Sequence, residues 1–140
     1  FEPGCGDADI TIAAVKAGAK KGVGIDIDAD RVKASKENVK KAGLEDKVEI
    51  RLGDALEQKD YADATVVMSY MGEEFNAIFR PVLWKTLKPG TRVVSHRFKY
   101  GDWKPEKSVT VTGADGGEYE LHLWVVTKEL KEKAEKDEKK

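Results

Sequence analysis

The sequence opens with a turn whose residue types suit the binding of a small molecule. Glu2-Pro3-Gly4-Cys5-Gly6-Asp7-Ala8 combines an acidic residue with two glycines that are one residue apart. Gly4 and Gly6 can adopt a positive φ, and because they have no Cβ they let the backbone approach a ligand closely. A helical pattern follows, so the turn would present helix N-terminal amides at the edge of a sheet, where open α/β folds bind ligands.

Two further carboxylates follow apolar runs. Asp26 lies near the end of the run 22–27, 20 residues after Gly6, which is the spacing at which an acid reaches the hydroxyls of a ribose. Asp54 follows a third run, 47–52. Each acid alone could cap a helix or stabilise a loop. Three successive strand ends that carry an acid on the same edge predict a nucleoside site.

With these motifs the chain resembles the class I S-adenosylmethionine (SAM)-dependent methyltransferases. The resemblance implies that the first turn binds the methionine part of SAM, the acid after the second strand the ribose, and Gly53-Asp54-Ala55 the adenine. The SAM-binding residues implied are Glu2, Gly4, Cys5, Gly6, Asp7, Asp26, Ile27, Asp54, Ala55 and Ser69. A dinucleotide is disfavoured, because Asp9 stands where nicotinamide-binding turns usually have their last glycine, and a carboxylate there would repel a pyrophosphate.

The second half of the chain indicates the methyl acceptor. Met68-Ser69-Tyr70-Met71 stands where nitrogen methylases of adenine and glutamine carry Asn/Asp-Pro-Pro-Tyr/Phe, so that substrate class is disfavoured. Arg92-Val93-Val94-Ser95-His96 and Gly101-Asp102-Trp103-Lys104-Pro105 resemble segments of the archaeal broad-specificity protein lysine methyltransferases, and the likeness covers residues 1–127. It implies methyl transfer from SAM to accessible lysines of a protein substrate. Methylation of a small molecule or RNA, and a SAM-binding module without activity, are the alternatives.

Tyr70 and Trp103 are the candidate residues of an acceptor channel. Tyr70 could line a lysine channel or belong to the core, and Trp103 could cover the core as a lid or form a wall of the acceptor site. His96 is expected to be a strand-end histidine bonded to neighbouring backbone. No general base is assigned, because an aromatic channel shifts a lysine, whose reference pKa is about 10.4, toward the neutral amine. No metal is expected, because Mg²⁺ requires a cluster of carboxylates and Asp102 is a lone carboxylate near the expected mouth of the acceptor site.

Composition limits the classes of protein to which the chain can belong. It has 140 residues, 40% hydrophobic and 36% charged, which suits one globular domain with a highly charged surface. The net charge of −1 provides no basic field to attract nucleic acid. One cysteine, Cys5, excludes a disulfide framework and is expected to be packed. No apolar run has membrane-spanning length and no signal peptide is recognised, so we predict a cytoplasmic protein without a membrane partner.

The order of the elements predicts an α/β, Rossmann-like class I methyltransferase fold with the mixed sheet order 3-2-1-4-5-7-6. Strand 1 is expected to be truncated, because Phe1-Glu2 look like its last residues. We therefore expect an N-terminally truncated SAM-binding domain over residues 1–127. A charged helical tail over 128–140 is expected to be solvated, with i,i+4 pairs as far as Glu135–Lys139.

Periodicity places the elements along the chain. A helix is predicted over 10–17, with Ile10, Ala13, Ala14 and Ala17 on its buried face. A second helix is predicted over 29–42 with Asp28 as its N-cap, and a third over 74–87, interrupted or restarted near Pro81 and with Ile78 on its buried face. The segments 108–112 and 119–126 are expected to form a final antiparallel hairpin.

Overall fold

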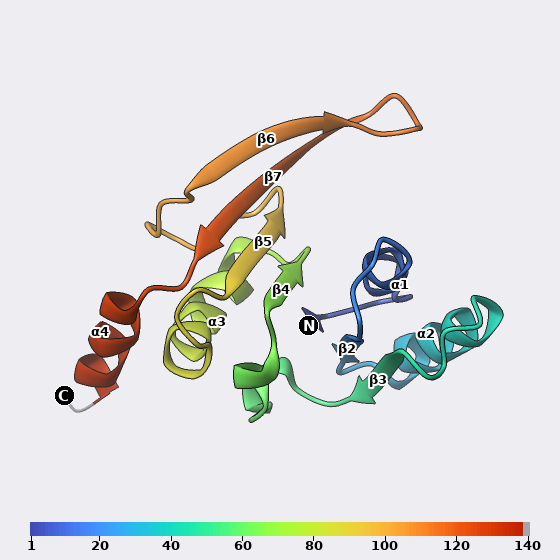
Figure 1. The fold of residues 1–140 in the computed structure, drawn as a ribbon, viewed down its shortest axis with the longest axis horizontal. Helices are drawn as coiled ribbons and strands as arrows, with labels where there is room; N and C mark the ends of the chain where they lie inside the picture. The colour runs from blue at the N-terminus through green and yellow to red at the C-terminus, as the bar shows by residue number, and fades with distance from the viewer. Residues whose placement is uncertain (139–140) are drawn as a thin grey trace. The chain divides into compact units, whose positions relative to one another are not determined.

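The computed structural model describes residues 1–138, which fold into two compact units, each with a sheet of its own. The first unit is Phe1–Gln58 and the second begins at Lys59 (Figure 1). The sheet of the first unit is parallel, in the order β1-β2-β3: β1 (Glu2–Pro3), β2 (Gly22–Asp26) and β3 (Val48–Leu52).

The sheet of the second unit has the order β4-β5-β7-β6. Its strands are β4 (Val66–Ser69), β5 (Arg92–His96), β6 (Lys107–Thr112) and β7 (Glu118–Val125). β4 and β5 are parallel, whereas β7 is antiparallel to both of its neighbours. The two orders are the two halves of the predicted order 3-2-1-4-5-7-6, so the predicted α/β class is confirmed.

The buried face of α1 (Asp9–Lys16) differs from the predicted one. Ile10 is 37% exposed, and Ala13 and Ala17 are exposed as well. The turn before the helix places Ala8 in the core, fully buried, and the residues four and seven positions further on share its side of the helix. The residues of α1 that face the core are therefore Thr11, Ile12 and Val15.

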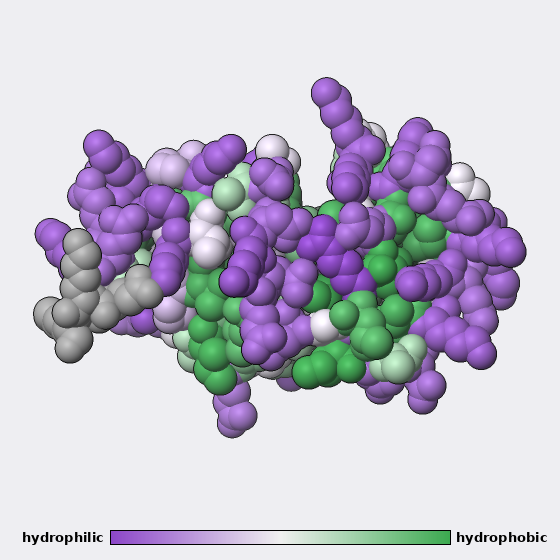
Figure 2. All heavy atoms as spheres, turned by 90° about the horizontal axis from the view of Figure 1, so that it is seen from below, coloured by the Kyte–Doolittle hydropathy of each residue, from purple (hydrophilic) through white to green (hydrophobic). Residues whose placement is uncertain are grey.

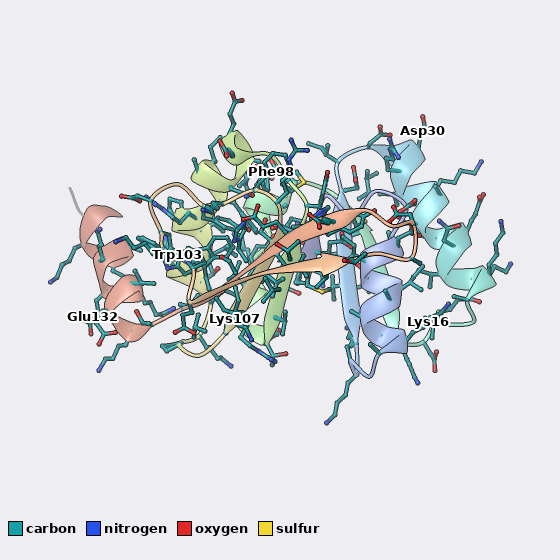
Figure 3. All side chains as sticks on the ribbon, turned by 90° about the horizontal axis from the view of Figure 1, so that it is seen from above. Lys16, Asp30, Phe98, Trp103, Lys107 and Glu132 are labelled. Carbon is teal, nitrogen blue, oxygen red and sulfur yellow. The ribbon has the colours of Figure 1, made fainter. Side chains whose placement is uncertain are left out.

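α2 (Ala29–Lys41) forms as predicted. The Asp28 carboxylate accepts a hydrogen bond from the backbone N–H of Asp30 at 2.8 Å and so caps the helix. Figure 3 shows Asp30 in the first turn of α2 and Lys16 in the last turn of α1. Both helices cover the same face of the first sheet, because one core cluster contains Ala8, Ile12, Val15, Val39 and Val48.

α3 (Glu73–Thr86) runs without interruption through Pro81, where a break was predicted. Pro81 has no N–H, so one backbone hydrogen bond is lost there. Phe79 and Leu83, on either side of it, are fully buried, while Pro81 itself is exposed. Packing of the flanking residues therefore keeps the helix continuous. Ile78, predicted for the buried face, is exposed instead.

The loop between β5 and β6 is tied to α3 and to β7. The Arg80 guanidinium donates to the Tyr100 carbonyl at 3.3 Å and forms an ion pair with Asp102. The Trp124 indole N–H donates to the carbonyl of Trp103, which Figure 3 labels in this loop, at 2.7 Å. Beyond the loop, the hairpin of β6 and β7 extends past the end of β5 (Figure 1), because β5 pairs with residues 121–125 of β7.

α4 (Lys128–Glu138) packs against α3, whereas the sequence predicted a solvated tail. The Lys131 ammonium donates to the carbonyls of Lys85 and Leu87 at 2.7 and 3.3 Å. The Lys133 ammonium lies 5.8 Å from the centre of the Trp84 ring. An amine can satisfy the free carbonyls at the end of a preceding helix, and apolar periodicity does not reveal this interaction. The predicted Glu135–Lys139 pair lies outside the described residues.

Charged and polar residues cover most of the surface seen in Figure 2, and hydrophobic side chains show between them. This agrees with a chain of which 36% is charged. Within residues 1–138, no helix combines the length and the apolar character that crossing a membrane requires.

Candidate functional site

The turn between β1 and α1 has the backbone conformation that its residue types predicted. Gly4 and Gly6 have φ angles of 61° and 58°, in the left-handed region that favours glycine. Ala8, with a φ of 69°, is left-handed as well. A Cβ added at Gly6 would meet no atom within 4 Å, so this side of the turn is open and its backbone can contact a ligand.

Polar side chains of α2 hold this turn in place, and sequence reasoning had not assigned them to the site. The Ser35 hydroxyl donates to the Gly6 carbonyl and lies 3.7 Å from the Cys5 sulfur. The Asn38 amide donates to the Asp7 carbonyl at 2.9 Å. Burial raises the pKa of the Cys5 thiol, so the thiol stays protonated and packs as a small residue. The available signal was the spacing of Val32, Ser35 and Val39 in the predicted helix 29–42, which places a hydroxyl on its apolar face.

Asp26, at the end of β2, is in direct contact with the turn. Its Oδ2 accepts a hydrogen bond from the Gly6 N–H at 3.0 Å, and its Oδ1 accepts one from the Asp28 N–H at 3.0 Å. Each oxygen of an ionised carboxylate has more than one lone pair, so both retain capacity for a further donor. The spacing of Gly6 and Asp26 predicted that they would share a site. The two residues are in hydrogen-bonding contact, and their shared role in SAM binding stays a prediction.

Glu2 is buried in β1 and bonded to the first turn of α1. Its Oε1 accepts hydrogen bonds from the Thr11 N–H at 3.2 Å and from the Thr11 hydroxyl at 2.6 Å. Burial raises the pKa of Glu2 to about 7, and the bonds from Thr11 partly offset that rise. A cation placed beside this carboxyl would favour its ionised form.

The third acid, Asp54, caps a short 3-10 turn, Ala55–Glu57. Its Oδ1 accepts a hydrogen bond from the Leu56 N–H at 2.8 Å, and Ala55 is buried. Two apolar side chains of the same unit are largely in water: Ile27, after β2, is 75% exposed, and Leu52, the last residue of β3, is 60% exposed. A flat ring that covered them would remove apolar surface from water.

These features of the first unit fit SAM. The open glycine turn can contact a ligand through its backbone, and Asp26 can accept further hydrogen bonds, as ribose hydroxyls would require. The carboxyl of Glu2 would balance positive charge, which SAM carries on its sulfur and its amine. Ile27 offers apolar surface to a purine ring. The contacts of these residues with SAM stay a prediction.

A substitution at Gly24 in β2 tests the packing beneath the glycine turn between β1 and α1. A Cβ added there would lie 2.9 Å from the Cβ of Cys5 and 3.2 Å from Cδ1 of Ile50. We expect Gly24→Ala to lower the free energy of unfolding by roughly 1–3 kcal/mol and to weaken SAM binding, because Cys5 belongs to the turn and must shift. Urea titration and calorimetry measure the two effects. Gly72→Ala, whose Cβ would meet nothing within 4 Å, is the control, and an equal loss in both variants would contradict this prediction.

In the second unit, Ser69 ends β4 and is buried. Its hydroxyl lies 3.0 Å from the hydroxyl of Tyr100. Burial raises the pKa of Tyr100 to about 12, so the phenol is protonated at neutral pH and can donate to Ser69. This bond connects β4 to the loop after β5, and the expected role of Ser69 in SAM binding stays a prediction.

The two acceptor candidates, Tyr70 and Trp103, belong to different groups of aromatic rings. Tyr70 is 45% exposed, and its ring centre lies 4.3 Å from that of His96 and 5.9 Å from that of Phe98. Trp103 packs edge-on against Trp84 at 5.5 Å. The surroundings of Trp103 favour its interpretation as a cover of the core, whereas Tyr70 keeps surface for a ligand.

His96 has surroundings that the sequence did not predict. Its ring lies between those of Tyr70 and Tyr119, with centres at 4.3 and 5.3 Å. Burial, and then the charge of Arg97, lower the pKa of His96, so the imidazole is neutral at pH 7. Within residues 1–138, His, Cys, Asp and Glu side chains do not gather in any group that could hold a metal ion.

The chain is similar to known methyltransferases. Residues 2–107 match the family model described as the ANTKMT methyltransferase domain. A protein-lysine N-methyltransferase of Saccharolobus islandicus is 37% identical over 128 residues, which cover 90% of this chain and 78% of that protein. A ribosomal protein L11 methyltransferase of Vibrio cholerae is 38% identical over 87 residues, which cover 62% of this chain but 29% of that protein.

A crystal structure described as an RNA methyltransferase from Salinibacter ruber in complex with S-adenosyl-L-homocysteine has the same fold. The two structures superpose with a TM-score of 0.83 and 39% sequence identity. The match covers 91% of this chain and 79% of that one.

Proposed function

We propose that this chain, which belongs to the ANTKMT methyltransferase domain family, methylates the side-chain amines of lysine residues in other proteins. It is a SAM-dependent methyltransferase with a Rossmann-like fold. The assignment of protein lysines as the methyl acceptor is supported above all by the likeness to a protein-lysine N-methyltransferase along 90% of the chain. Its cytoplasmic location stays a prediction.

The residues of the first unit would hold SAM, which when bound supplies a methyl group on a positively charged sulfur. The backbone of Gly4 to Gly6 would hold the methionine part together with Glu2. Asp26 would accept hydrogen bonds from the ribose hydroxyls, and Asp54 would accept one from the adenine amino group. None of these residues needs to take up a proton from the acceptor.

In the second unit, Tyr70 would contact the acceptor. A lysine must lose its proton before it can accept a methyl group, and about one molecule in 2,500 is neutral at pH 7. Desolvation of the amine lowers its pKa and raises that fraction, so no dedicated base is required. The neutral His96 beside Tyr70 adds no positive charge that would repel the acceptor.

The likeness to the RNA methyltransferase from Salinibacter ruber favours a second candidate, methylation of RNA. Methylation of protein lysines and methylation of RNA can be distinguished by incubating the chain with SAM labelled in its methyl group and with the protein and RNA fractions of a cell extract. We expect label in the protein fraction that resists nuclease. Label that nuclease removes would favour RNA instead, and SAM binding without any labelling would indicate a binding module.

A further inference from the structure

We propose that Tyr70, His96 and Tyr119 form one aromatic row that binds the positively charged side chain of the methyl acceptor. This inference rests on the proposed function and names a specificity surface for it. The three rings come from different parts of the second unit: Tyr70 follows β4, His96 ends β5, and Tyr119 lies in β7. Ring centres 4.3 and 5.3 Å apart make the row continuous.

Strand register produces the row. β4 and β5 pair with Ser69 opposite Ser95, so the next residues along the two strands, Tyr70 and His96, lie side by side. β5 and β7 pair with His96 opposite Leu121, and Tyr119 lies two residues before Leu121, on the same face of β7.

The backbone beneath the row is fixed in an unusual conformation. Arg97 follows His96 and has a φ of 67°, a left-handed conformation that is unfavourable for a non-glycine residue. Its N–H donates to the Glu120 carbonyl at 2.8 Å. The buried amide of Asn76 and the hydroxyl of Ser95 both donate to the Phe98 carbonyl. Such strain is retained where the surrounding contacts determine the local geometry, and here they orient His96.

The chemistry of the row suits a cation. Aromatic faces attract ammonium groups, and the attraction increases as the site loses water. His96 is neutral at pH 7, so it adds a ring without adding positive charge. The Tyr119 hydroxyl donates to the Asp115 carboxylate, which places a negative charge at one end of the row. The hairpin segment 113–120 carries three acidic residues and no basic ones, which offset the positive charge of Arg97 beside His96 and favour a cationic ligand over a nucleic acid.

The row binds the charged side chain before the amine loses its proton. Tyr70 is 45% exposed, so it can meet a protonated lysine at the surface of the second unit. The same surface accepts a methylated lysine, which keeps its positive charge.

Binding of trimethyl-lysine, measured against its neutral carbon isostere, tests the row without any turnover. In wild-type protein we expect trimethyl-lysine to shift the ring resonances of Tyr70 and His96 in NMR spectra, and the isostere to bind more weakly. Tyr70→Leu should weaken trimethyl-lysine binding roughly 2- to 30-fold, with Tyr70→Phe in between. Ile78→Ala, at an exposed position of α3, is the matched control.

Three outcomes would contradict the proposal that the row binds a cationic side chain. These are equal binding of trimethyl-lysine and its isostere, an unchanged affinity of Tyr70→Leu for trimethyl-lysine, and ring shifts produced by adenosine monophosphate and not by trimethyl-lysine. These outcomes are distinct from failure of the proposed function. If the chain methylates lysines while Tyr70→Leu keeps the wild-type KM for the protein acceptor, the row is wrong and the function stands. If trimethyl-lysine binds selectively and Tyr70→Leu abolishes that binding while only RNA is labelled, the proposed function fails, and the row is a lysine-binding surface that is not the acceptor site.

Discussion

Replacing Asp26 with alanine is expected to weaken SAM binding by roughly 10- to 150-fold for each hydrogen bond that is lost, because bonds to charged groups are worth about 1.5–3 kcal/mol. The carboxylate is also bonded to the Gly6 N–H, so its removal loosens the glycine turn as well. Isothermal titration calorimetry with SAM measures the effect directly. Thermal unfolding of the same variant establishes that the fold is retained.

Asp30→Ala is the matched control for this prediction. Asp30 is an exposed acid in the first turn of α2, close to Asp26 in sequence. Its replacement changes the net charge by the same amount, so a loss of affinity in both variants would indicate a general electrostatic effect. If Asp26→Ala binds SAM as tightly as the wild type, Asp26 is not part of the site.

The second large effect is a pH dependence of stability that originates in Glu2. In the unfolded chain this carboxyl ionises near its ordinary pKa of 4.5, whereas in the folded protein burial keeps it protonated up to about pH 7. Between these values the folded state binds more protons, so the free energy of unfolding falls as the pH rises. The expected loss, relative to Glu2→Gln, is on the order of 3 kcal/mol, and it is complete once the pH exceeds about 7.

Urea denaturation of the wild type and of Glu2→Gln between pH 4 and roughly pH 8 measures this difference. Glu49→Gln is the control, because Arg51 lowers the pKa of Glu49 and the contribution of that group has the opposite sign. The stabilising contribution of Glu49 is present above the pKa that its carboxyl has in the unfolded chain, and it is lost as the pH falls. In Glu49→Gln the free energy of unfolding should therefore still fall as the pH rises toward neutral. A wild type and a Glu2→Gln variant with parallel profiles would show that the Glu2 carboxyl is not perturbed.

The features that the sequence predicted correctly are those that local residue chemistry decides. The positive φ angles of Gly4 and Gly6 and the cap at Asp28 follow from residue type and short spacing. The strand order within each unit also agrees with the predicted order.

The incorrect predictions about the fold have a common cause. In each case tertiary packing selects one of several structures that the local sequence allows equally well. The buried face of α1 is set by Ala8, a residue outside the helix. α3 continues through Pro81 because its neighbours Phe79 and Leu83 are held in the core. α4 is anchored by Lys131, whose charged end caps another helix.

The candidate site was predictable only in part, for the same reason. Tyr70 could be chosen from its place after a strand. Its ring neighbour His96 lies 26 residues further on and is brought beside it by the register of β4 and β5. Ser35 and Asn38, which brace the glycine turn, reach it from another helix. Contacts of this kind depend on the pairing of distant segments, which no local pattern specifies.

Identification of the methylated residue tests the central claim most directly. The chain is incubated with SAM carrying a deuterated methyl group and with a protein extract, and the products are digested and sequenced by mass spectrometry. Our account predicts deuterated methyl groups on lysine side chains, and their disappearance when the lysines of the extract have first been blocked by acetylation. Labelling that persists on other residues after acetylation, or that is confined to RNA in a parallel reaction, would contradict the assignment to protein lysines.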